Sequence, residues 1–214
     1  MSQNVTFRQA LNTSLPNDDI ITMIRGILRL CIKLRTLAVI NIDQNDWSRI
    51  EAVIPATTEN LIVGPIHGPL DIHILSRAPL LRNLTSVNTY MGDHEIHDIV
   101  MCPRVRKFRR VFSALHLPYE YAMQQLPAVS KSETLAEMEI LIVGTENERE
   151  MYEKQRCRYS DFFHDTRTVC NFQLDSGSGW TGWLYDEFVK EPYSEHDILF
   201  PVHHWLMLLL PANQ

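Results

Sequence analysis

Nine histidines make a metal site the first chemistry to consider in this sequence. His94 and His97 are three residues apart, and two imidazoles with that spacing can face the same side of a helix. The local string is H-E-I-H, however, and zinc proteases need H-E-x-x-H, so the ligands and the base fall on the wrong faces. His203 and His204 are adjacent and would point to opposite faces of a strand. The sequence therefore predicts no metal site and a solvated helix face around His94.

Two side chains could act as nucleophiles. Ser178 lies in the turn string GSGW, which lacks the G-x-S-x-G elbow of serine hydrolases. Cys157 is flanked by Arg156 and Arg158, which favour the thiolate, but no histidine or asparagine partner can be assigned to it. The chain has eight glycines and neither phosphate-binding glycine motif, so no cofactor is expected. We predict no catalytic residue. The alternative is a small hydrolase or transferase that uses Ser178 and the carboxy-terminal histidines.

Basic residues are concentrated in one predicted strand. The string RVRKFRR covers residues 104–110 and is predicted to be a strand. If Phe108 faces the core, Lys107 and Arg109 point to the other face of the sheet, because successive side chains of a strand alternate. Basic residues on an open sheet face predict a site for an acidic protein partner. The predicted partner-binding residues are Lys107, Arg109, Arg106, Arg82 and Asn83.

A structural role is the competing interpretation of this segment. The next expected strand, AEMEILIVG, places Glu137 opposite Lys107 and Glu139 opposite Arg109. Neighbouring strands lie about 4.8 Å apart, so these residues can form ion pairs across the sheet. Nucleic-acid binding is a third interpretation, against which the formal net charge of -6 and the two glutamates argue.

A repeat in the sequence predicts the elements that hold these residues. Prolines recur every 24 residues, at Pro55, Pro79, Pro103 and Pro127. An apolar segment with helical spacing precedes each proline, and a short strand follows each of the first three. We expect parallel strands, adjacent in chain order, whose inward residues are Leu37, Leu61, Leu84, Phe108 and Met138.

Each unit is interpreted as one helix followed by one strand. The second unit's helix is predicted to bury one face, made by Trp47, Ile50, Val53 and Ile54. Helix starts are predicted near Asp46, Asp71 and Asp93. The fold class is α/β, a leucine-rich-repeat-like solenoid with a parallel sheet and a C-terminal cap. The alternative, a small sheet of the flavodoxin type, needs turn glycines at a nucleotide crevice, which this sequence lacks.

The segment ILRLCIKLRTLAVIN resembles the LCPNLRTL unit in the leucine-rich tails of F-box-like proteins from mushroom-forming fungi. CPRVRKF, APLLRNL and the turn PIHGPLD at residues 65–71 resemble further copies, so that the resemblance covers about residues 20–145. Ile32 stands where the unit has a proline. The resemblance implies a protein-binding solenoid related to the substrate receptors of ubiquitin ligases. Only LPNDDII, residues 15–21, resembles the start of an F-box, so the helices that bind the ligase adaptor are expected to be missing.

The last third of the chain has a different pattern. The charged string at residues 145–158 predicts an exposed helix, and TVCNFQL predicts a strand. DSGSG then predicts a turn, WTGWLYDEFVKE a short amphipathic helix, and HHWLMLLL a final buried strand. The predicted division is an N-terminal arm at 1–19, the solenoid at 20–144 and a C-terminal cap region at 145–214.

Composition limits the class of protein. With 45% hydrophobic residues, the chain can form a sizeable core. Its longest uninterrupted apolar run, residues 205–211, is far shorter than the ~20 residues that span a bilayer. The first residues contain no apolar segment of the kind found in signal peptides. We therefore expect an intracellular, non-enzymatic protein-binding domain in the cytoplasm or nucleus.

Overall fold

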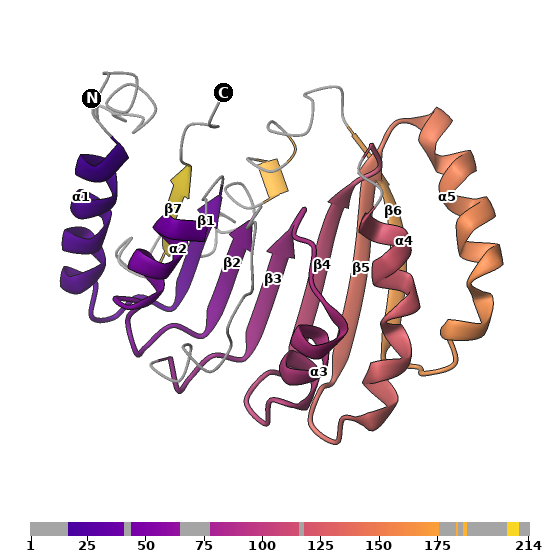
Figure 1. Cartoon of the computed structure of the whole chain (residues 1–214), viewed down its shortest axis with the longest axis horizontal. Helices are drawn as coiled ribbons and strands as arrows, with labels where there is room; N and C mark the ends of the chain where they lie inside the picture. The colour runs from indigo at the N-terminus through magenta and orange to yellow at the C-terminus, as the bar shows by residue number, and fades with distance from the viewer. Residues whose placement is uncertain are drawn as a thin grey trace, which may run out of the picture.

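The chain forms one parallel β-sheet with helices against it (Figure 1). The structure, a computed structural model, describes residues 17–40, 44–64, 78–115, 118–175, 183, 186–187 and 205–209. Its seven-stranded sheet has the order β6-β5-β4-β3-β2-β1-β7, and every neighbouring pair is parallel. The α/β class with a parallel sheet is confirmed.

The strands from β1 to β6 follow the order of the chain. They are β1 (Thr36–Ile40), β2 (Asn60–Gly64), β3 (Asn83–Val87), β4 (Lys107–Ser113), β5 (Glu137–Gly144) and β6 (Thr168–Leu174). The helices are α1 (Asn17–Leu30), α2 (Gln44–Glu51), α3 (Asp93–Met101), α4 (Pro118–Gln124) and α5 (Glu146–Arg158), with 3-10 turns η2 (Leu126–Lys131) and η3 (Ser160–Phe162). The flavodoxin order 2-1-3-4-5 places β2 and β3 on opposite sides of β1, whereas here β3 lies beside β2, so that alternative is wrong.

The predicted strand register is confirmed. Each predicted inward residue lies directly beside the next, in the order Leu37, Leu61, Leu84, Phe108 and Met138. All of them are buried. A shift of one residue in any strand would turn its apolar residues to the other face, so the match fixes both faces of the sheet.

The helices lie on one side of the sheet and share a single apolar core with it (Figure 1). Ile24 and Leu28 of α1, Trp47 of α2, Ile99 of α3 and Tyr152 of α5 are all buried in this core. The other side of the sheet, called here the outer face, carries none of the helices α1 to α5. It is defined by the strand residues that alternate with the inward ones.

One backbone pattern recurs at the starts of β2, β3, β4 and β5. A single carbonyl oxygen accepts hydrogen bonds from two successive N–H groups of the next unit's strand start. The accepting carbonyls belong to Arg35, Glu59, Arg82 and Arg106, and the donor pairs are residues 59–60, 82–83, 106–107 and 136–137. The repeat in the sequence is therefore also a repeat of backbone hydrogen bonds.

Some helix boundaries differ from the predictions. Helix α2 ends at Glu51, so Val53 and Ile54 pack on the core from the turn after it. Helix α3 begins at Asp93, as predicted, but its capping residue is Gly92, whose N–H donates to the Glu95 carboxylate at 2.8 Å. A carboxylate three residues into a helix can take this role as well as a capping aspartate. Asp71 and the PIHGPLD turn lie outside the described residues.

The C-terminal third contributes to both edges of the sheet. The predicted helix and strand are present as α5 and β6, and β6 extends the sheet beside β5. Strand β7 (Trp205–Leu209) pairs with β1 at the opposite edge. The predicted DSGSG turn, most of the amphipathic helix and most of the N-terminal arm lie outside the described residues. Among the helices that are described, none is both long and apolar enough to cross a membrane.

Candidate protein-binding face

A row of polar side chains crosses the outer face where the strands begin. The Asn60 side-chain amide donates to the Thr36 hydroxyl at 2.9 Å, and the Asn83 side-chain amide donates to Asn60 Oδ1 at 2.6 Å. Lys107 Nζ continues the row by pairing with Glu137 Oε2 at 2.8 Å. The Lys107 side chain is 58% exposed, so this ion pair lies in water. Each strand from β1 to β5 supplies one residue to this polar row.

A second ion-paired row lies one step further along the strands. Arg109 Nε lies 2.9 Å from Glu139 Oε2, and Arg109 Nη1 lies 2.9 Å from Glu187 Oε1. The Asn171 amide donates to the other Glu139 oxygen at 3.2 Å. Both predicted cross-strand pairs, Lys107 with Glu137 and Arg109 with Glu139, are therefore confirmed. The Glu187 contact was not predicted, because no repeat relates it to β4.

The far end of the outer face is apolar and covered. Trp183 is 3% exposed and packs in a cluster drawn from β1 to β5, which contains Ala38, Ile40, Ile62, Val87, Val111, Leu141 and Val143. Sequence reasoning missed this contact. The signal was available, because the strands end in unbroken apolar runs such as ILIV in β5, and such runs indicate burial on both faces.

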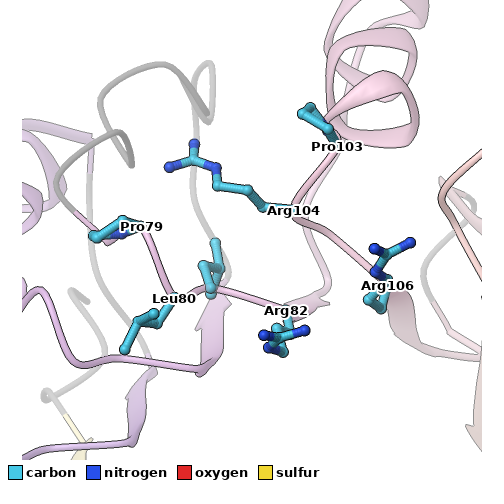
Figure 2. A pocket seen from close by; sticks show the side chains of 7 residues that line it. Pro79, Leu80, Arg82, Pro103, Arg104 and Arg106 are labelled. Atoms are coloured by element: carbon cyan, nitrogen blue, oxygen red, sulfur yellow. The ribbon is translucent and has the colours of Figure 1, made fainter.

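A small pocket opens beside the polar row, between the turns that precede β3 and β4 (Figure 2). Its volume is about 190 Å³, and its lining is Pro79, Leu80, Leu81, Arg82, Pro103, Arg104 and Arg106. Two of the predicted partner-binding residues, Arg82 and Arg106, line this pocket. Arg104, Leu80 and the two prolines were not among the predicted site residues. Leu80 and Arg104 each follow a repeat proline, so the 24-residue period could have paired them.

Arg110 belongs to the core, although it ends the basic segment. Its guanidinium is fully buried and donates to Gln125 Oε1 at 2.6 Å and to the Thr89 carbonyl at 3.4 Å. Burial lowers the pKa of Arg110 to about 9, so the side chain is still charged at neutral pH. The Gln125 amide continues the network to Asp93 Oδ1 at 2.9 Å. The exposed positive charge of residues 104–110 is smaller than the sequence suggests.

The other candidate chemistry is not assembled in the part of the chain that the structure describes. No group of three His, Cys, Asp or Glu side chains there could hold a metal ion. His94 and His97 are exposed on α3, which confirms the solvated helix face. Cys157 is exposed on α5, and its neighbour Arg156 lies 3.9 Å from Glu153. Ser178, His203 and His204 lie outside the described residues.

Comparison with known proteins gives no relative. No family model, no curated protein and no solved structure matches this chain. The function must therefore be inferred from the outer face itself.

Proposed function

We propose that this chain is a non-enzymatic protein-binding domain that uses the uncovered part of its outer face. The observation that carries the proposal is the polar row of Thr36, Asn60, Asn83, Lys107 and Glu137, in which Thr36 is buried and the four residues from β2 to β5 reach the surface. A surface built in this way can contact an extended partner with one side chain from each unit.

The architecture supports this use of the sheet. In our proposal, the helix-strand units form a leucine-rich-repeat-like solenoid, with α1 to α5 on its convex side and the outer face on its concave side. The strand order and the repeated turn hydrogen bonds fit such an array. The apolar ends of an array need cover, and we assign this capping role to the C-terminal region that supplies β7 and Trp183.

Binding at the polar row would cost little internal energy. Lys107 and Glu137 form an exposed ion pair, and such pairs contribute only about 0–1 kcal/mol. A partner carboxylate can therefore replace Glu137 as the partner of Lys107. Arg109 is less accessible, with a side chain 27% exposed and two carboxylates on it. We accordingly place the partner over Asn60, Asn83 and Lys107.

Membership of a ubiquitin ligase is a separate part of the proposal, and it comes from the resemblance to F-box-like proteins. Among the described residues a single helix, α1, precedes β1, and α1 is part of the main core. We therefore propose a relative of the substrate-binding repeats of such receptors, and we assign no adaptor-binding role to the described residues.

Site-specific photo-cross-linking tests the proposal. A benzophenone amino acid is placed at Asn83 on the outer face or, as the control, at Met151, which is 56% exposed on α5. In extracts from the native source, we expect a discrete protein adduct at position 83 that is absent at position 151 and is lost with Lys107→Glu. Identical adducts at both positions would contradict the proposal, as would the lack of an adduct at position 83. Recovery of the cullin adaptor would add membership of a ubiquitin ligase and would leave the proposed binding face unchanged.

A further inference from the structure

We infer that the pocket between the turns before β3 and β4, named here the arginine pocket, binds one anionic side chain, a carboxylate or a phosphate, on an extended peptide. Three arginines, Arg82, Arg104 and Arg106, are among the residues that line it. The inference does not depend on the proposed function, since the pocket lies in the turns before β3 and β4 and can be tested with peptides alone.

The charge of the arginine pocket is not neutralised by the residues that line it. No Asp or Glu is among them, and none of the three arginines has an ion pair with a described residue. The glutamate of the preceding turn, Glu59, lies 3.7 Å from Arg35 instead. This concentration of positive charge occurs in a chain whose formal net charge is -6. An anion bound in the arginine pocket would offset part of this positive charge.

Hydrogen-bond donors remain free for such an anion. Arg106 uses Nη1 to donate to the Thr134 carbonyl at 2.8 Å, which fixes this side chain at the strand start. A guanidinium has five N–H donors in a planar fork, and this fork matches the two oxygens of a carboxylate or phosphate. Figure 2 shows Arg104 extending from its turn toward Pro79 of the neighbouring turn. In this view the Arg104 side chain points away from Arg82 and Arg106, which stand at the two strand starts, so the three arginines line the pocket from different sides.

The size of the arginine pocket decides what kind of ligand it takes. Small-molecule and cofactor sites usually have volumes of about 300–1,000 Å³. At about 190 Å³ the arginine pocket is smaller, and it suits one side chain of a larger partner. Pro79, Pro103 and the 45% exposed Leu80 provide apolar contacts for the flanking residues of a peptide. A nucleic acid fits less well, because Glu137 and Glu139 lie on the adjoining outer face.

Fluorescence anisotropy with the full chain tests the site. The probes are three labelled nine-residue peptides of Ala and Gly with a Leu beside a central phosphoserine, glutamate or serine, and a nine-nucleotide DNA strand. We expect the phosphoserine or glutamate peptide to bind at least tenfold more tightly than the serine peptide. Whichever of the two binds more tightly identifies the natural anion as phosphate or carboxylate.

Variants connect the binding to the arginine pocket. Arg82→Ala with Arg104→Ala should weaken binding of the anionic peptide at least tenfold, whereas Arg35→Ala with Lys154→Ala, which removes the same charge elsewhere, should change it less than threefold. If the double alanine variant does not fold, Arg82→Lys with Arg104→Lys keeps the charge, removes the fork and should still weaken binding.

Three results would overturn the inference. These are equal binding of all three peptides, equal losses in the pocket and control variants, and tighter binding of the DNA strand than of either anionic peptide. Each of these can occur while the cross-link at position 83 persists, so the two proposals can fail separately.

Discussion

Arg110 shows how one buried charge organises its surroundings. Its guanidinium has no carboxylate within ion-pair distance among the described residues, and its Nε has no hydrogen-bond partner. Gln125 supplies the close acceptor and passes the connection to Asp93, which also accepts from the Tyr121 hydroxyl at 2.8 Å. This network joins β4 to α4 and to the start of α3. The neutral glutamine is therefore the residue on which the buried charge depends.

Replacing Gln125 should be more damaging than replacing the arginine. Gln125→Leu should destabilise the protein by about 2–3 kcal/mol, because it removes a hydrogen bond to a charged group and leaves the charge buried. Arg110→Met removes the charge and keeps much of the side chain's length, so it should cost less. Urea unfolding of the two single variants and of the double variant checks this. If the double variant is less stable than Gln125→Leu alone, the charge of Arg110 is not the cause.

At the scale of the elements, the strands were predictable and the helix ends were not. The strand register follows from the near-constant spacing of Leu37, Leu61 and Leu84, since aligning the units on this spacing places the three leucines side by side on the buried face. Helix α2 ends earlier than its apolar pattern, since Val53 and Ile54 reach the core from a turn. An apolar pattern records burial and does not distinguish a helix from the turn that follows it.

The two faces of β3 give a direct test of this register. Leu84 is 1% exposed, so Leu84→Ala should destabilise by about 2–5 kcal/mol, the usual range for truncating a buried leucine. The adjacent outer-face residue Thr85 is only partly buried, and Thr85→Ala should change stability by no more than about 0.5 kcal/mol. Urea midpoints of the two variants provide the comparison. Equal losses would mean that the faces are assigned wrongly.

Charge reversal tests the pairing between β4 and β5. Lys107→Glu and Arg109→Glu each place like charges on neighbouring strands, which is destabilising. Arg109→Glu should cost more, because it faces both Glu139 and Glu187 and is less exposed than Lys107. Adding Glu139→Lys and Glu187→Lys should restore the melting temperature of Arg109→Glu. Rescue by Glu139→Lys alone would mean that the Glu187 contact contributes nothing.

At the scale of the whole molecule, the contacts of the C-terminal third could not be derived from the repeat. Strand β7 pairs with β1, and Trp183 packs against residues of five strands, although neither lies in a repeated unit. A periodic pattern predicts contacts between neighbouring units only. Contacts between the two ends of the chain depend on which apolar surface is left uncovered after the units have stacked. The apolar runs indicate that one end of the outer face is covered, but they do not indicate which segment covers it.

Trp183 should therefore contribute strongly to stability. Trp183→Ala is expected to destabilise by about 3–5 kcal/mol, as for other buried tryptophans, and to expose the apolar end of the outer face. Binding of the dye ANS to the native variant should rise, since such dyes bind exposed apolar surface. Met151→Ala on the exposed side of α5 is the matched control and should change neither measurement. Unchanged ANS binding and stability in Trp183→Ala would mean that this side chain does not cover the sheet.

The carbonyl that accepts two N–H groups at the starts of β2 to β5 also indicates how such a chain could gain or lose one helix-strand unit. Deleting residues 83–106 would join Arg82 directly to Lys107, and both N–H groups would meet the Glu59 carbonyl just as those of Arg82 and Asn83 do now. Strand β4 would then lie beside β2 with its inward and outward residues unchanged. An ancestral gene could therefore gain or lose a whole unit by recombination and remain folded. Each such event would alter the polar row by one residue, and here it would also remove the arginine pocket, so ligand choice could evolve by steps of one unit.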